Sequence, residues 1–176
     1  MSRASDHVKW CINKAKKEIE ECNKLGKREK HRGLLKVITD QNRVKKHLEK
    51  AEHDFKAIKK FSETGFSDWS INAGFYAIYQ CFLAIALKSG YESGNQECTI
   101  SLIEWLNEEG KINIDKKFID LLKHEEAKEM NGNKIIDMRE DYTYGVETSV
   151  KDKEKIDELI LICKELIDIT KEIVLK

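Results

Sequence analysis

Apolar residues recur at three- and four-residue steps along much of the chain, and this spacing is typical of amphipathic α-helices. One such stripe covers residues 6–25, and Gly26 follows it at a position suited to ending a helix. A second stripe predicts a long helix over residues 38–62. The helix that carries the last stripe is expected to begin at Ser149 or Asp152. No alternation typical of a β-strand persists anywhere, so the pattern predicts an all-α fold.

The segment between Asp68 and Gly90 has a different pattern, because it is apolar almost all round. A helix of this kind is expected to be enclosed by its neighbours. Its apolar run, residues 71–87, is interrupted by Asn72 and Gln80 and falls short of the roughly 20 apolar residues that span a bilayer. We therefore expect the buried central helix of a soluble protein, with no membrane contact.

Shorter helices are expected between the central helix and the last one. Thr99 or Ser101 can cap a helix that contains the sequence IEWLNEEG, and Asp115 can cap the next. Residues 131–133 (Asn-Gly-Asn) break the chain before the segment IIDMREDYTYG. The whole pattern predicts a bundle of five to six helices.

Composition supports one small domain. A chain of 176 residues is long enough for a single core, and nine glycines without any proline fit long helices joined by short turns. The five cysteines are odd in number and include no CxxC pair. We interpret them as reduced thiols of a cytoplasmic protein rather than a disulfide framework or zinc site, and we expect no metal and no cofactor. The N-terminal residues lack an apolar core of signal-peptide length.

Charge is unevenly distributed along the chain. Residues 1–60 hold 18 Lys and Arg against 9 Asp and Glu, whereas the remainder of the chain is correspondingly acidic, so the net charge is zero. The basic residues are densest in residues 24–36. This basic segment can be a solvated surface without any binding role. Alternatively, it can be a binding site for RNA or another polyanion. The residues that would bind it are Lys24, Lys27, Arg28, Lys30, Arg32 and Lys36.

The order of segments from His47 to Ile173 resembles the HEPN superfamily. The helix HLEKAEHDFKAIKKF is followed by DWSINAGFYAIYQCFLAIALKSGY, by a short helix after NQECTISLIEWL, by MREDYTYG and by a closing amphipathic helix. The resemblance implies an up-and-down helical bundle of the HEPN type, with four to five helices over residues 37–176, that pairs with a second copy. Residues 1–36 then form an N-terminal helix and basic loop added to this bundle.

Many HEPN proteins are metal-independent ribonucleases whose motif is Arg, four to six residues, then His, and two such motifs meet across the dimer. This sequence keeps Arg139 but has no histidine after His124. Tyr144 stands where the shortest motif would place His, and a tyrosine of ordinary pKa near 10 is a poor base at pH 7. The catalytic residues therefore stay unknown, with Arg139 and Tyr144 as candidates.

Arg139 has two interpretations. It can form a structural ion pair with Asp137, Glu140 or Asp141, as surface arginines often do. Alternatively, it can line a dimer cleft and bind an anion or nucleotide, with Asp141 and Tyr142 beside it. Tyr142 would share a helix face with Arg139 because it lies three residues further on.

Other candidates have simpler explanations. Tyr76 and Tyr79 are expected to be core or interface aromatics, and Glu97 and Glu104 to cap or solvate a helix, although both could line a cleft. His47 and His53 are six residues apart and face different sides of a helix, which argues against a metal site. The three tryptophans are expected to anchor the core: Trp10, Trp69 and Trp105.

Three functions remain open at this point. The first is a non-catalytic or weakly catalytic homodimer that binds RNA or acts with a nucleotidyltransferase partner, as in resembling toxin–antitoxin and defence systems. The second is an active ribonuclease that uses Arg139 with Tyr144 or His124. The third is a plain interaction scaffold. The missing histidine favours the first and leaves enzymatic activity uncertain, with a leaning against it.

Overall fold

The computed structural model describes residues 2–123 and 134–176, and its structure is 71% helical. This confirms the all-α helical bundle that the sequence predicts. In chain order the elements are α1 (Arg3–Lys24), β1 (Leu34–Lys36), α2 (Gln41–Glu63), α3 (Ser67–Lys88), β2 (Tyr91–Ser93), α4 (Gln96–Glu108), α5 (Lys116–Asp120), α6 (Ile135–Tyr144) and α7 (Lys153–Val174).

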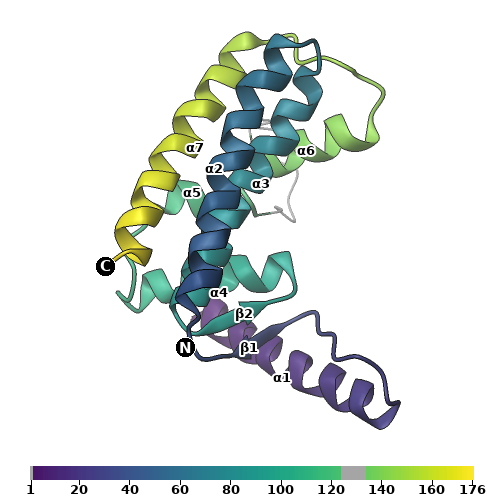
Figure 1. Cartoon of the computed structure of the whole chain (residues 1–176), viewed down its shortest axis with the longest axis vertical. Helices are drawn as coiled ribbons and strands as arrows, with labels where there is room; N and C mark the ends of the chain where they lie inside the picture. Colours follow the sequence, from purple (N-terminus) through teal and green to yellow (C-terminus); the bar gives the residue numbers. More distant parts are fainter. Residues whose placement is uncertain (1, 124–133) are drawn as a thin grey trace.

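The long helices α2, α3 and α7 pack side by side and form the body of the bundle (Figure 1). Their N-termini follow the capping rules where the sequence offers a cap. Asp40 accepts hydrogen bonds from the first backbone N–H groups of α2, and Asp152 does the same for α7. The short helix α6 packs against α3, at the upper end of the bundle in Figure 1.

The central position of α3 follows from its all-round apolar sequence. Phe75 and Phe82 are almost fully buried, as expected, whereas Leu83 is only half-buried. Gly74 lets α7 approach closely, because a Cβ atom at this position would lie 2.5 Å from a methyl carbon of Leu159. By length and composition α3 could cross a membrane, but 72% of its apolar window is buried, which fits the core helix of a soluble protein.

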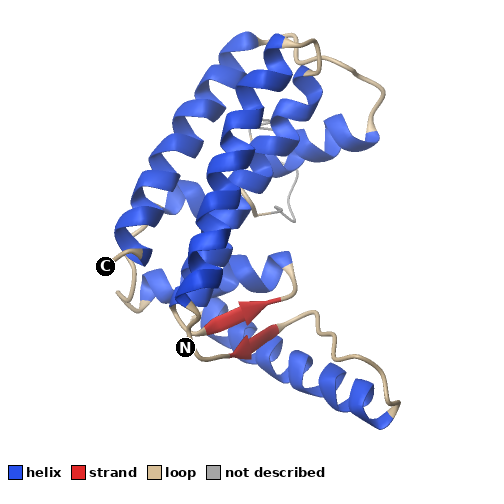
Figure 2. Ribbon diagram, in the orientation of Figure 1, coloured by secondary structure: helices blue, strands red, loops and turns tan. Residues whose placement is uncertain are grey.

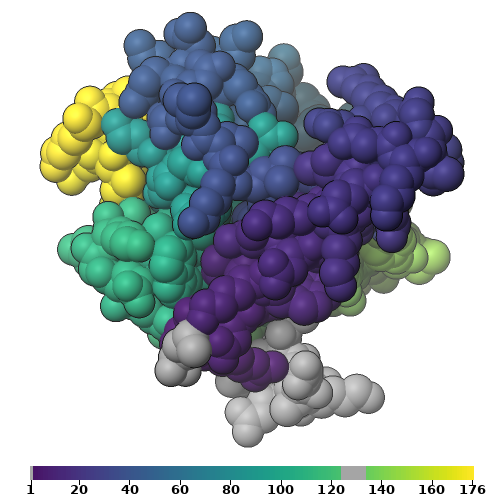
Figure 3. All heavy atoms as spheres, turned by 90° about the horizontal axis from the view of Figure 1, so that it is seen from below, coloured from purple at the N-terminus to yellow at the C-terminus, as the bar shows by residue number. Residues whose placement is uncertain are grey.

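The N-terminal segment lies across the lower end of the bundle, where α1 packs against α4 and β1 (Figure 3). The strands β1 and β2 pair antiparallel, with Leu34 opposite Ser93 (Figure 2). Gly33 permits the close approach of β1 to α1, since a Cβ atom there would stand 2.2 Å from the carbonyl oxygen of Cys11. The sequence shows no persistent strand alternation because three-residue strands are too short to produce one, and the two strands leave the all-α class unchanged.

Two of the predicted helix starts also differ from the structure. α4 begins earlier than expected: Asn95 is its N-cap and accepts a hydrogen bond from the backbone N–H of Cys98, whereas Thr99 and Ser101 lie inside the helix. α3 begins at Ser67 with no side-chain cap, and Asp68 lies in its first turn. Asn and Ser cap helices comparably well, so spacing alone did not identify the correct residue.

The interpretation of all five cysteines as reduced thiols was wrong. Cys11 of α1 and Cys98 of α4 form a disulfide, and their Cα atoms are 5.9 Å apart. Cys22, Cys81 and Cys163 are free thiols. The two bonded cysteines are 87 residues apart in the sequence, so their pairing depends on how α1 docks on α4 rather than on any local motif.

Candidate functional site

Arg139 lies on the exposed helix α6 and is held against the central helix. Its guanidinium carbon is 4.5 Å from the ring centroid of Phe75, which is buried in α3. The contact is a cation–π interaction, which attracts the cation to the ring face while consuming none of its N–H donors. Buried Ile135 and Ile136 fix the start of α6 in the core, so the position of Arg139 is determined by packing.

The structural ion pair that the sequence offered for Arg139 is not formed. Within residues 2–123 and 134–176, the structure records no ion pair between Arg139 and Asp137, Glu140 or Asp141. The guanidinium therefore keeps donors that are not engaged by a carboxylate of the described chain. Arg139 is half-buried, so part of its side chain is accessible to solvent.

Tyr142 and Tyr144 differ in their surroundings. Tyr142 lies one turn after Arg139, as predicted, and packs against the core. Burial, followed by the nearby carboxylates Glu147 and Asp141, raises the pKa of Tyr142 above its ordinary value. The Tyr142 hydroxyl is thus deprotonated in an even smaller fraction of molecules at neutral pH than a free tyrosine, so little phenolate is present to accept a proton. Tyr144 ends α6 with 77% of its surface exposed.

Aromatic side chains of α3 lie exposed next to α6. Trp69 and Tyr76 are 54% and 48% exposed, and they are separated by seven residues, which places them on one face of the helix. Asn72, between them, accepts a hydrogen bond of 2.9 Å from the Thr143 hydroxyl of α6. The Tyr76 ring also packs edge-on against Phe75, the residue that contacts Arg139. We call this surface the α3–α6 face: Trp69, Asn72, Tyr76, Arg139 and Thr143.

The prediction that all three tryptophans anchor the core was wrong. Trp10 is 52% exposed, and Trp69 belongs to the α3–α6 face. Trp105 is partly buried, packs edge-on against Tyr91 and carries the Lys111 ammonium over its ring. Tryptophan content alone does not indicate which helix face is covered. Tyr79, by contrast, is largely buried and contacts the Thr99 hydroxyl, and burial raises its pKa.

A cleft of about 880 Å³ lies between α1 and α4, far from Arg139 in the sequence. Glu97 and Glu104 both line it, so the interpretation that they could add carboxylates to a cleft fits the structure. Lys123 pairs with Glu104 at 2.5 Å, and His7 meets the Ser101 hydroxyl through Nδ1 at 2.7 Å. No local pattern in the sequence indicated this cleft, because its walls come from helices about ninety residues apart.

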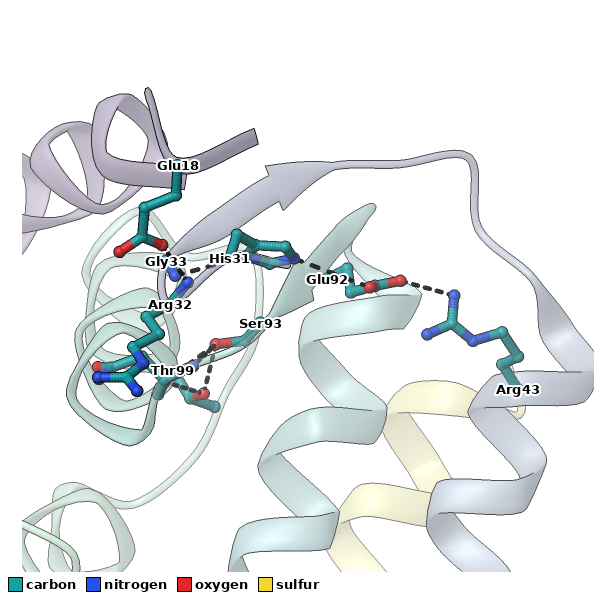
Figure 4. A network of polar contacts seen from close by, with 9 residues as sticks. Glu18, His31, Arg32, Gly33, Arg43, Glu92, Ser93 and Thr99 are labelled. Carbon is teal, nitrogen blue, oxygen red and sulfur yellow. Dashed lines mark hydrogen bonds and ion pairs between the residues drawn. The ribbon is translucent and has the colours of Figure 1, made fainter. Parts of the chain in front are cut away.

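The basic loop projects from the lower end of the molecule, beyond the C-terminal end of α1 (Figure 1). All six predicted polyanion-binding residues are exposed: Lys24, Lys27, Arg28, Lys30, Arg32 and Lys36. The loop is tied down at its return to the bundle (Figure 4). There the backbone N–H of Arg32 donates to Glu18, and Glu92 links His31 to Arg43, with 2.7 Å between Glu92 Oε2 and the Arg43 guanidinium.

His47 and His53, which the sequence argued against as metal ligands, have polar contacts within the protein. Nδ1 of His47 contacts the side-chain oxygen of Gln80 at 2.8 Å, and His53 lies beside Asp54 in α2. Contacts with neighbouring side chains of the protein therefore account for both His47 and His53. His124, which the ribonuclease hypothesis offered as a base, lies outside the described residues.

Comparison with known proteins gives one positive result. A family model described as the HEPN domain matches residues 44–173, which include α3, α4, α5 and α6 together with most of α2 and α7. The match excludes α1 and the basic loop. No curated protein matches the chain.

Proposed function

Since the chain belongs to the HEPN domain family, we propose that it acts as a homodimer whose two α3–α6 faces meet. In this proposal the paired faces bind an anionic ligand, with RNA as the expected one, and do not cleave it. The observation that supports this proposal is the pairing of exposed aromatic rings with an arginine that forms no ion pair with a carboxylate among residues 2–123 and 134–176.

Aromatic residues and arginine are the side chains that protein interfaces favour, whereas exposed tryptophans are unusual on a monomer surface. Trp69 and Tyr76 lie on one helix face, as a helix-pairing surface requires. In a symmetric dimer each residue of this face would meet the same face of the second copy, so two Arg139 side chains would converge. Their N–H donors would then hold one phosphate group bidentately.

The absence of turnover follows from the missing acid–base group. Attack by a ribose hydroxyl requires a proton acceptor, and arginine remains protonated at neutral pH. Tyr142 holds its proton more tightly than usual, and Tyr144 is exposed to solvent. Neither described tyrosine near Arg139 is therefore suited as the base, and the contribution we propose for Arg139 is charge stabilisation alone. We propose that any catalysis comes from a partner, a nucleotidyltransferase being the kind that the family resemblance suggests.

The basic loop adds a second anion-binding surface in this proposal. Six exposed Lys and Arg side chains within residues 24–36 can neutralise several phosphates without reading sequence. We further propose that residues 1–36 are an addition to a HEPN bundle over residues 37–176, and that the protein works in the cytoplasm.

Sedimentation of face variants tests the dimer. We expect the wild-type chain to be a dimer at tens of micromolar, with an interface of about 1,200 Å² or more. The variant W69K/Y76K should sediment as a folded monomer, because four introduced charges would be buried in the symmetric interface. Leu161→Lys is the matched control, since Leu161 is an exposed apolar residue on α7, outside the α3–α6 face, and this variant should remain dimeric. A wild-type monomer, or a W69K/Y76K dimer, would contradict the proposal.

A further inference from the structure

Three potential metal-binding side chains come together where α1 docks on α4. The cluster consists of His7, Cys11 and Cys98, and one ligand atom from each lies within 4.8 Å of the others. Both cysteines are fully buried, whereas His7 is half-buried and lines the cleft between the two helices. Water or an ion entering the cleft can therefore reach the imidazole, while the sulfur atoms lie behind it.

Local structure favours a ligand geometry for these residues. His7 and Cys11 are four residues apart on α1 and thus share one helix face. Cys98 lies in the first turn of α4, where the partial positive charge of the helix end stabilises a thiolate. The Ser101 hydroxyl lies 2.7 Å from Nδ1 of His7. A hydrogen bond at Nδ1 orients the imidazole and leaves Nε2 as the nitrogen that can bind a metal. Residues that hydrogen-bond to histidine ligands in zinc sites have the same effect.

We propose that the reduced form of this cluster binds Zn²⁺ through the two sulfur atoms and one imidazole nitrogen. The sequence predicted no metal site because it lacks a CxxC pair and because Cys98 is 87 residues from Cys11. Two thiolates and one histidine are a known zinc ligand set, which leaves the fourth tetrahedral position for water. Zn–S bonds of about 2.3 Å place the two sulfur atoms roughly 3.8 Å apart, a separation that side-chain rotation can reach from the bonded pair.

The reaction balances as a two-electron exchange followed by metal binding. A cellular dithiol transfers two electrons and two protons to the Cys11–Cys98 bond, yielding two thiols and the disulfide of the reductant. Zn²⁺ then displaces both thiol protons, which pass to water, and two Zn–S bonds form. The cluster thus joins α1 to α4 in either redox state, by a covalent bond when oxidised and by the metal when reduced. This inference is independent of the α3–α6 face.

Metal titration of the full-length chain tests the proposal. The protein is reduced with a phosphine, freed of metal with a chelator, and titrated with Co²⁺ and then Zn²⁺. We expect one Co²⁺ per chain with thiolate-to-cobalt charge-transfer absorption, which Zn²⁺ then removes. The same protein oxidised before titration should show no such absorption, and this comparison requires no mutation.

Two variants identify the ligands. His7→Gln leaves both thiols in place and should weaken Zn²⁺ binding at least tenfold, whereas Cys22→Ser, which removes a half-exposed free thiol, should bind as the wild type does. Absence of stoichiometric binding by the reduced wild type would overturn the proposal. So would charge-transfer absorption that persists after oxidation, or unchanged affinity in His7→Gln.

Discussion

Reduction of the Cys11–Cys98 disulfide should lower the free energy of unfolding by an amount that depends on the length of the loop that the bond closes. The bond closes a loop over a sequence separation of 87 residues. In the chain-entropy description, a loop of this length restricts the unfolded state by about 4.6 kcal/mol at 25 °C. For a chain of 176 residues, a loss of that size corresponds to a decrease in Tm of roughly 9–18 °C.

Thermal and urea unfolding followed by circular dichroism measure this effect. The protein is compared with and without a phosphine reductant, with a chelator present in both samples so that no metal binds the reduced thiols. The C11S/C98S variant serves as the control and should unfold at one midpoint regardless of reductant. Equal midpoints for oxidised and reduced wild-type protein would refute the reasoning, because they would mean that the bond does not constrain the unfolded chain.

Three further predictions concern the core, alkaline pH and the basic loop. Phe82→Ala should lower the free energy of unfolding by about 3–5 kcal/mol in urea titrations, and half-buried Leu83→Ala by clearly less; equal losses would argue against the burial of the Phe82 ring. Burial raises the pKa of Cys81 to about 12 and that of Cys163 further, so both thiols stay protonated in the folded state. Stability is then complete below about pH 9 and falls between about pH 9 and 12, by about 1.4 kcal/mol per pH unit for each thiol, and Cys81→Ala should reduce that slope. Charge reversal of the basic residues in 24–36 should weaken RNA binding in a low-salt shift assay and make its salt dependence less steep, and unchanged affinity would show that the loop is only solvated surface.

The sequence predicted the helical architecture well because periodicity is a local property. The stripes that indicate α1, α2 and α7 need only neighbours three and four residues away, and the all-round apolar pattern of α3 correctly indicated a buried core helix. Capping residues were harder to predict. Asp115 and Asp152 do cap α5 and α7, but Asn95 competed with two later residues and was missed.

Contacts between distant segments were beyond the sequence pattern. The Cys11–Cys98 bond and its neighbour His7 depend on α1 docking against α4, which no local spacing encodes. The exposure of Trp69 likewise depends on which side of α3 its neighbours cover. For Arg139, the sequence identified the residue but could not choose between an ion pair and an open guanidinium, because that choice depends on side-chain geometry.

The central claim is that Arg139 binds an anion without catalysing its cleavage. The most direct measurement is an assay of a short single-stranded RNA with the pure protein, with binding and cleavage followed in the same samples. Arg139→Ala is compared with Lys116→Ala, which removes one exposed positive charge from α5. We expect no cleavage by any of the three proteins and a loss of affinity of about tenfold or more in Arg139→Ala alone. Cleavage by the wild-type protein that disappears in Arg139→Ala, with Lys116→Ala unaffected, would contradict the claim and identify an active ribonuclease.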